Sequence, residues 1–523
     1  MSNTLSIIRS LIIYSLCLPL AVWLGYLLAM PMDMTSFIIV ALALFLPLVP
    51  VLLRWHHFLL IASWNFAAVL FFLPGRPNVW IVMSLVSMLL SILQHILSSE
   101  KKLLSVPSVA RPLIFLFLVI LATGELAGGL GFKSFGSEAY GGKRYVLVLT
   151  AIIGYFAISS QRIPRGREVL YVSIFLLSGA SSIIGNLAGF VPSFLNFIFL
   201  FFPVQDVMAL HGEAPTDVST YRFVGLVPAG SAVVWYGLAR YGLGGVFRLS
   251  EPWNFPPFRI RGGFQINQPW RAGLVLLATL MSLQGGFRSA VIFFAMIFLL
   301  HFFIERLYRS RALPFILVMA TLSVAISLPM ASKLPPMIQR AISFLPLEID
   351  PLIRMSAESS TEWRLRMWQA VLPTVPQFLL VGKGYSIDPA AMEMAGGSMS
   401  RDDTEAMIVS GDYHNGPLTL LIPLGIWGVI GFLWFLGAGF RVLHRNYRYG
   451  APELRRINTF LLMYFLIKVF FYFFIFGSFH VEFFIFTGLV ALSISVNGGV
   501  RGPVPVVSPQ PTFNRLQLAR VGR

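Results

Sequence analysis

The sequence predicts an all-α fold, a polytopic integral membrane bundle of about 14 transmembrane helices. Two observations carry this prediction. Of the 523 residues, 57% are hydrophobic and 12% are charged, which is about half the charged fraction of a typical soluble protein. The apolar residues also gather in repeated runs of roughly 17 to 25 residues, the length of helix that crosses a bilayer.

The runs divide the chain into four expected parts. Residues 1–330 would hold transmembrane helices 1–11, and residues 331–414 one large extracytoplasmic loop with short helices. Residues 415–497 would hold helices 12–14. The proline-rich, basic residues 498–523 are expected to form a disordered cytoplasmic tail.

The distribution of charge predicts sidedness. The net charge of +17 would suit nucleic acid, but the basic residues lie in short clusters between apolar runs, as in loops held on the cytoplasmic side. We therefore expect no nucleic-acid partner and a multi-pass protein of the bacterial inner membrane. Both termini would be cytoplasmic and the long loop periplasmic. The single cysteine, Cys17, excludes an internal disulfide and a multi-cysteine zinc site.

The long loop contains a predicted helix. Ser359, followed three residues later by a glutamate, has the capping-box pattern of a helix start, and Pro373 is expected to end the helix. On such a helix Arg364 and Trp368 share a face, whereas Arg366 points roughly the opposite way. The alternative is an amphipathic helix on the membrane surface with its arginines at the headgroups.

Two further arginines stand at the predicted outer ends of spans. Gly285 and Gly286 allow a tight turn, after which Arg288 begins a span from the outer side. An arginine there is costly unless it reaches the interface or has an anionic partner. Arg222 enters an earlier span from the same side. For both, the alternative is an interfacial arginine whose side chain extends to the headgroups.

The loop ends at His414-Asn415-Gly416-Pro417. Pro417 suits the first turn of a helix and Asn415 its N-cap. His414 would then lie at the positive end of a helix dipole, where a neutral ring able to accept a proton is favoured. The alternative is a capping or interfacial histidine.

The predicted topology rests on the cytoplasmic clusters alone, yet it places Arg222, Arg288, Arg364 and His414 on one side. Several guanidiniums and one neutral histidine suit a phosphate-bearing substrate and an acceptor hydroxyl. We therefore expect Arg288, Arg364 and His414 to line one outward-facing cavity.

This arrangement resembles the O-antigen ligase and O-antigen polymerase superfamily of membrane glycosyltransferases. The resemblance covers roughly residues 170 to 490, and Phe287 departs from it, because the family more often has serine before this arginine. The matching pieces are Arg222 with Gly225, the turn at Arg288, Arg364 with Trp368, Gly382-Lys383-Gly384, and His414-Asn415 followed by Leu418 and Gly425.

Such families transfer a glycan en bloc from a polyprenyl-diphosphate donor to an acceptor sugar hydroxyl, without a metal or cofactor. The resemblance implies that Arg288 and Arg364 bind the diphosphate and that His414 is the general base. The further expected substrate-binding residues are Arg222, Trp368, Asn415 and Lys383. The acidic pair Asp402 and Asp403 is the alternative, as a metal site, although a solvated acidic loop is favoured.

Three functions stay open within these observations. We favour a polymerase that links repeat units of a surface or secreted polysaccharide, because the outer loop is large and the spans are many. A ligase that joins the glycan to a lipid A core or a protein uses the same parts. The alternative of another class is a lipid-linked glycan flippase or other transporter, with in-membrane charges at Arg240, Lys468, Glu125 and Glu482.

The position of the charges separates these classes. Charged side chains that converge at one membrane–water interface favour the enzyme. A charged pathway through the centre of the membrane bundle favours the transporter. The expected partners are the lipid-linked donor, a glycan or lipid-linked acceptor, membrane lipids and a chain-length regulator protein.

Overall fold

The computed structural model describes residues 48–97, 104–128, 141–204, 222–247, 269–309, 313–388 and 404–503, and a few single residues elsewhere. The chain divides into two compact units, Met1–Leu59 and Leu60–Arg523, and α3 (Leu48–Ser63) crosses their boundary. The arrangement below is that of the second unit. The first predicted spans, Cys17, the pair Asp402–Asp403 and the tail beyond Pro503 lie outside the described residues.

The described residues are helical, with no strand among them apart from one isolated bridge between Val69 and Asn78. The predicted all-α membrane class is confirmed, and the total of about 14 spans stays a prediction. Among the described helices, seven are long and apolar enough to cross a membrane. They are α4 (Val79–Leu97), α5 (Pro107–Ala127), α6 (Gly142–Ser159), α7 (Glu168–Leu177) continued by η1 (Ser178–Leu187), α18 (Gly416–Tyr449), α19 (Arg455–Phe474) and α20 (Phe479–Asn497).

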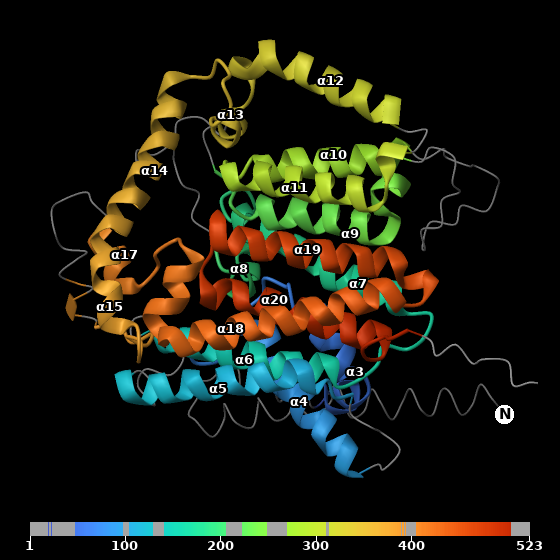
Figure 1. Ribbon diagram of the computed structural model, residues 1–523, viewed down its shortest axis with the longest axis vertical. Helices are drawn as coiled ribbons and strands as arrows, with labels where there is room; N and C mark the ends of the chain where they lie inside the picture. The colour runs from blue at the N-terminus through green and yellow to red at the C-terminus, as the bar shows by residue number, and fades with distance from the viewer. Residues whose placement is uncertain are drawn as a thin grey trace, which may run out of the picture. The chain divides into compact units, whose positions relative to one another are not determined.

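The helices pack side by side as a bundle (Figure 1). Helix α18 contacts α5, α19 and α20, and α20 in turn contacts α6. On the other side, α19 packs on α9 (Leu226–Phe247) and on α11 (Arg288–Ile304), and α9 packs on α10 (Pro269–Leu283). Helix α20 is mostly apolar beyond His480 and Glu482 in its first turn, and it is mostly buried, as expected for a helix at the centre of a bundle.

Aromatic side chains fill the contact between α18, α19 and α20. The Phe432 ring lies 5.2 Å from Phe479 and 5.2 Å from Tyr472, and Phe479 lies 4.9 Å from Phe483, all between ring centres. These rings are fully buried. The two contacts of Phe432 are edge-to-face, an arrangement that adds to the energy of area burial.

Helix α18 is broken inside the bundle. Gly425 has φ 63° and ψ −167°, two residues after Pro423, so local main-chain carbonyls lose their helical donors. The N–H groups of Lys383 and Gly384 donate to the carbonyls of Ile422 and Pro423 at 2.7 and 2.9 Å. The Gly-Lys-Gly segment thus restores hydrogen bonds that an unpaired buried backbone would lack.

The segment between α11 and α18 contains α12 (Leu313–Met330), η5 (Ala331–Lys333), α13 (Pro336–Ile342), α14 (Pro351–Val371), η6 (Leu372–Thr374), α15 (Val375–Phe378) and α17 (Thr404–Ser410). The predicted helix start at Ser359 is wrong. Helix α14 begins at Pro351, where the Asp350 carboxylate accepts from Leu352 N–H at 2.8 Å. An N-cap aspartate followed by proline is the stronger start signal. The predicted end near Pro373 is confirmed, since α14 ends at Val371.

Candidate active site

The turn between α10 and α11 is held by two arginines. Gly286 has φ 65°, a conformation that glycine adopts without strain. Arg222 Nε donates to the Gly285 carbonyl at 2.7 Å, and Arg340 Nη1, from α13, donates to the Gly286 carbonyl at 2.8 Å. The Arg222 guanidinium also lies 3.9 Å from the Phe287 ring centre. Phenylalanine before the turn arginine therefore serves as a stacking surface for Arg222.

Helix α14 brings a further arginine to the same turn. Arg288, the first residue of α11, donates from Nη2 to the Thr361 hydroxyl at 2.8 Å. Arg364 lies on α14 one turn after Thr361. Its guanidinium is 5.7 Å from the Phe476 ring centre. Its Nε is buried and has no hydrogen-bond partner in the described part of the chain. A buried donor without a partner is costly, which points to a ligand at this place.

Arg222, Arg288, Arg340 and Arg364 form one half-buried group, here called the arginine cluster. Burial, together with the charges of Arg340 and Arg364, lowers the pKa of Arg222 to about 10. Burial lowers the pKa of Arg340 as well, assisted by Arg288 and Arg364. The side chains therefore lie close enough to repel one another, and a dianionic or more highly charged ligand would relieve that repulsion.

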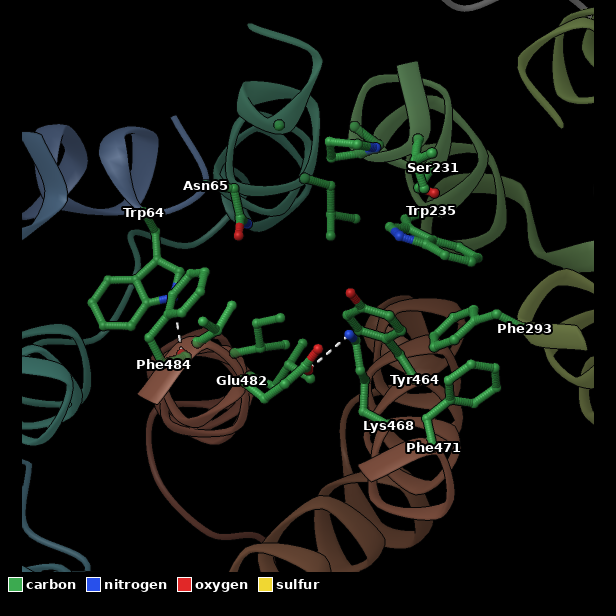
Figure 2. Close-up of a pocket in the computed structure, with 18 of the residues that line it drawn as sticks. Trp64, Asn65, Ser231, Trp235, Phe293, Tyr464, Lys468, Phe471, Glu482 and Phe484 are labelled. Atoms are coloured by element: carbon green, nitrogen blue, oxygen red, sulfur yellow. Dashed lines mark hydrogen bonds and ion pairs between the residues drawn. The ribbon is translucent and has the colours of Figure 1, made fainter. Parts of the chain in front are cut away.

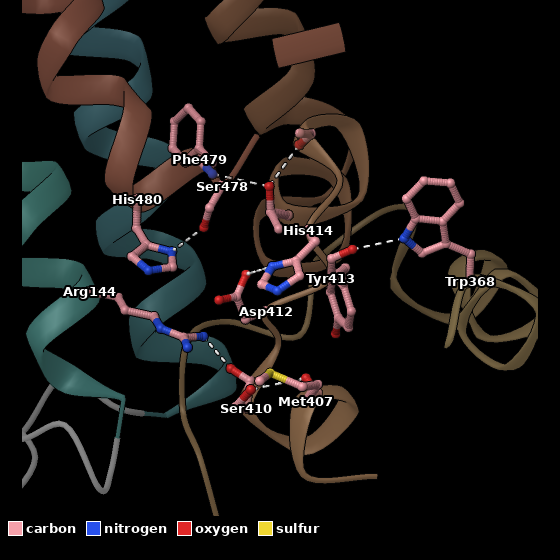
Figure 3. A network of polar contacts seen from close by, with 12 residues as sticks. Arg144, Trp368, Met407, Ser410, Asp412, Tyr413, His414, Ser478, Phe479 and His480 are labelled. Atoms are coloured by element: carbon pink, nitrogen blue, oxygen red, sulfur yellow. Dashed lines mark hydrogen bonds and ion pairs between the residues drawn. The ribbon is translucent and has the colours of Figure 1, made fainter. Parts of the chain in front are cut away.

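His414 pairs with a carboxylate that the sequence interpretation had not singled out. Its Nδ1 lies 3.2 Å from Asp412 Oδ1 (Figure 3). Burial alone would raise the pKa of Asp412, but the contact with His414 and the nearby His480 and Arg144 lower it. An ionised Asp412 favours the tautomer with the proton on Nδ1, which leaves Nε2 to accept a proton. His414 has φ 48°, an unfavourable conformation for a non-glycine residue that is concentrated at functional sites.

Two residues expected to bind substrate form hydrogen bonds with the backbone around His414. Trp368 Nε1 donates to the Tyr413 carbonyl at 2.8 Å. The Asn415 side chain accepts from Leu418 N–H at 3.1 Å, which confirms it as the N-cap of α18. These contacts restrain the residues immediately before and after the histidine.

Lys383 is the remaining residue expected to bind substrate. Its main chain pairs with the broken part of α18, and its side chain is exposed.

Phe476, between α19 and α20, joins the two halves of the site. Its ring centre lies 5.3 Å from that of His414, and Arg364 lies over the same ring. The structure thus places Arg222, Arg288 and Arg364 near one another, and Arg364 and His414 on one ring. That Arg288, Arg364 and His414 line one outward-facing cavity stays a prediction. Arg340 and Phe476 were missed: the first is one of many loop arginines, and the second stands in a phenylalanine-rich run.

The described residues contain no group of three or more His, Cys, Asp or Glu side chains that could hold a metal ion. The pair Asp402–Asp403 lies outside these residues.

Comparison with known proteins relates part of the chain to one family. No curated protein matches the sequence significantly. The family model for O-antigen ligase matches residues 272–433. This region runs from α10 into α18 and includes Arg288, Arg340, Arg364 and the Asp412–His414 pair. Residues 272–433 thus match the O-antigen ligase family, and together with the apolar helices this match supports a membrane protein of the O-antigen ligase/polymerase type.

Proposed function

We propose that this protein transfers a glycan en bloc from a polyprenyl-diphosphate donor to a sugar hydroxyl of an acceptor, at the periplasmic face of a bacterial inner membrane. One observation carries the proposal. Arg364, one of the four half-buried arginines of the cluster, and the aspartate-oriented His414 lie against the same ring, Phe476. The reaction needs an anion-binding group for the diphosphate and a base for the hydroxyl.

The arginine cluster would take the donor. The bond between the glycan C1 and the diphosphate oxygen breaks, and negative charge develops on the leaving polyprenyl diphosphate. The unpartnered Nε of Arg364 and the guanidinium of Arg288 can donate to phosphate oxygens. Arg222 and Arg340 hold the turn carbonyls and add positive charge behind them. Fixed donors around a developing charge lower the barrier without reorganisation.

The Asp412–His414 pair would take the acceptor. As the acceptor oxygen bonds to the glycan C1, its proton passes to Nε2 of His414, and Asp412 stabilises the imidazolium that forms. Trp368 and Asn415 act as positioning residues, because they restrain the backbone on either side. No step of this mechanism needs a metal ion.

Within this class we propose a polymerase that links repeat units of a surface or secreted polysaccharide, supported by the long segment between α11 and α18. A ligase that joins the glycan to a lipid A core or protein is the second candidate, since the matching family model bears that description. A transporter is disfavoured, because the arginines and histidine gather where α11 and α18 begin.

The experiment is glycan transfer by purified protein in proteoliposomes, supplied with the lipid-linked oligosaccharide of the producing strain. A ladder of repeat units indicates a polymerase, and a single addition to a lipid A core indicates a ligase. His414→Ala should lower transfer about 100-fold or more while donor binding persists. Arg288→Ala should weaken donor binding as well, with partial rescue by Arg288→Lys. Full activity of His414→Ala would exclude its role as the base.

A further inference from the structure

A cavity adjoins the candidate active site. It has a volume of about 550 Å³, within the range of small-molecule sites. Its wall comes from the segment just after α3 and from α4, α6, α7, η1, α9, α11, α19 and α20, all within the unit Leu60–Arg523 (Figure 2). Phe287, Phe476 and His480 also line it. Phe287 lies under Arg222, and Phe476 lies against His414. The cavity and the active site therefore share a wall.

An ion pair faces this cavity. Lys468 Nζ, from α19, lies 2.8 Å from Glu482 Oε2, from α20, and each side chain is 15% exposed. Lys468 keeps two further N–H donors, and Glu482 keeps its second oxygen as an acceptor. Charged groups within a membrane bundle are costly and are concentrated at functional sites. Both residues lie outside the region that matches the O-antigen ligase family model.

The rest of the cavity wall combines aromatic rings with a few polar side chains. Trp235 packs with its ring centre 5.3 Å from Phe293 and 5.3 Å from Tyr464, which makes it a rigid aromatic surface. Asn65 donates from Nδ2 to the Phe175 carbonyl, so its oxygen is left as an acceptor. Figure 2 shows Asn65 and Ser231 turned toward the space above the ion pair. Rigid aromatic rings with a few converging polar groups are typical of a specific ligand site.

A sugar ring is chemically complementary to such a wall. It presents an apolar C–H face and a rim of hydroxyls that both donate and accept hydrogen bonds. An aromatic ring fits the face, while Lys468, Glu482 and Asn65 supply donors and acceptors for the rim. A polyprenyl chain could make no hydrogen bond to the ion pair and would leave it desolvated.

We propose that this cavity binds an uncharged sugar ring of the acceptor glycan. The proposal rests on the transferase function above and extends it to the recognition of the acceptor. The ion pair has no net charge, so it favours a neutral ring over an acidic or amino sugar. The shared wall at Phe476 brings a sugar bound in the cavity close to His414, which accepts the proton.

The first test removes the pair without leaving a lone buried charge. In Lys468→Met/Glu482→Leu, the KM for the acceptor should rise about 10-fold or more. Donor binding and the kcat at saturating acceptor should be unchanged. Thermal stability should be equal or higher, because apolar replacement of a buried pair is often neutral. Lys468→Arg should keep part of the affinity. An unchanged acceptor KM in the double variant would overturn the inference and leave the transferase function standing.

The second test does not depend on transfer. The oligosaccharide released by mild acid from the lipid-linked donor is titrated into the protein in nanodiscs and followed by calorimetry. Saturable binding should occur in the wild type, fall about 10-fold or more in the double variant, and resist competition by polyprenyl phosphate. Displacement by polyprenyl phosphate, or no binding, would refute the sugar site. Binding by a protein that transfers no glycan would support the cavity and reject the transferase function.

Discussion

The pair of Asp412 and His414 gives the sharpest prediction. Asp412→Asn keeps the shape of the side chain but removes the negative charge beside Nδ1, 3.2 Å away. A hydrogen bond to a charged group is worth about 1.5–3 kcal/mol. Lost from the transition state, this energy corresponds to a decrease in kcat of roughly 10- to 160-fold. The KM for the donor should not change, because the arginine cluster binds it.

The assay is initial-rate transfer in proteoliposomes with saturating donor. Asp388→Asn is the matched control, since Asp388 is an exposed aspartate in the same long segment that caps a local turn. This control should transfer at the wild-type rate.

A double-mutant cycle tests the reasoning directly. Asp412 acts through His414, so Asp412→Asn should cost nothing further in a His414→Ala background. If the two losses multiply, Asp412 acts on the substrate or the fold independently of the histidine. The orienting role would then be refuted. Equal transfer by Asp412→Asn and the wild type would refute it as well.

Three further predictions follow from the same contacts. Arg364→Ala should reduce donor binding about 10-fold or more, whereas Arg366→Ala, on the exposed side of α14, should have little effect; equal losses in a binding assay would mean that α14 is a basic surface helix. Gly382→Ala should lower thermal stability, because its Cβ would lie 2.4 Å from a carbonyl of α18 at φ 83°, whereas Gly437→Ala meets no atom within 4 Å and should be neutral or stabilising; the reverse order in a thermal melt would contradict the account of the break. Adding a chelator should leave the rate of glycan transfer unchanged. Loss of transfer in the presence of chelator would instead indicate a metal site at the acidic pair Asp402–Asp403.

The membrane class follows from composition because a bilayer imposes a length and an apolarity on every span. Local helix starts are less readable. The pattern at Ser359 resembles a cap, yet Asp350-Pro351 begins the same helix earlier, and Ser359 instead donates to the Ser356 carbonyl within it. The segment therefore contains two plausible N-caps, and the helix starts at the first of them, Asp350.

The sequence predicted the site residues that belong to short motifs. Arg288, Arg364 and His414 could be brought together from sidedness alone. Arg340 could not, because its role depends on how α13 packs over the turn after α10. Asp412 stands two residues from His414, but only the positive φ of His414 turns the two side chains together.

The arginine cluster also implies that the folded protein is less stable without a bound anion than with one. Burial, together with the charges of Arg340 and Arg364, lowers the pKa of Arg222 to about 10 in the folded protein. The folded state thus binds this proton less tightly than the unfolded chain, so a charged Arg222 opposes folding at neutral pH, and the cost declines as pH rises above about 10. A diphosphate among the four guanidiniums would remove the repulsion and stabilise the fold. The stability given up by the empty protein is thus the source of its affinity for an anion.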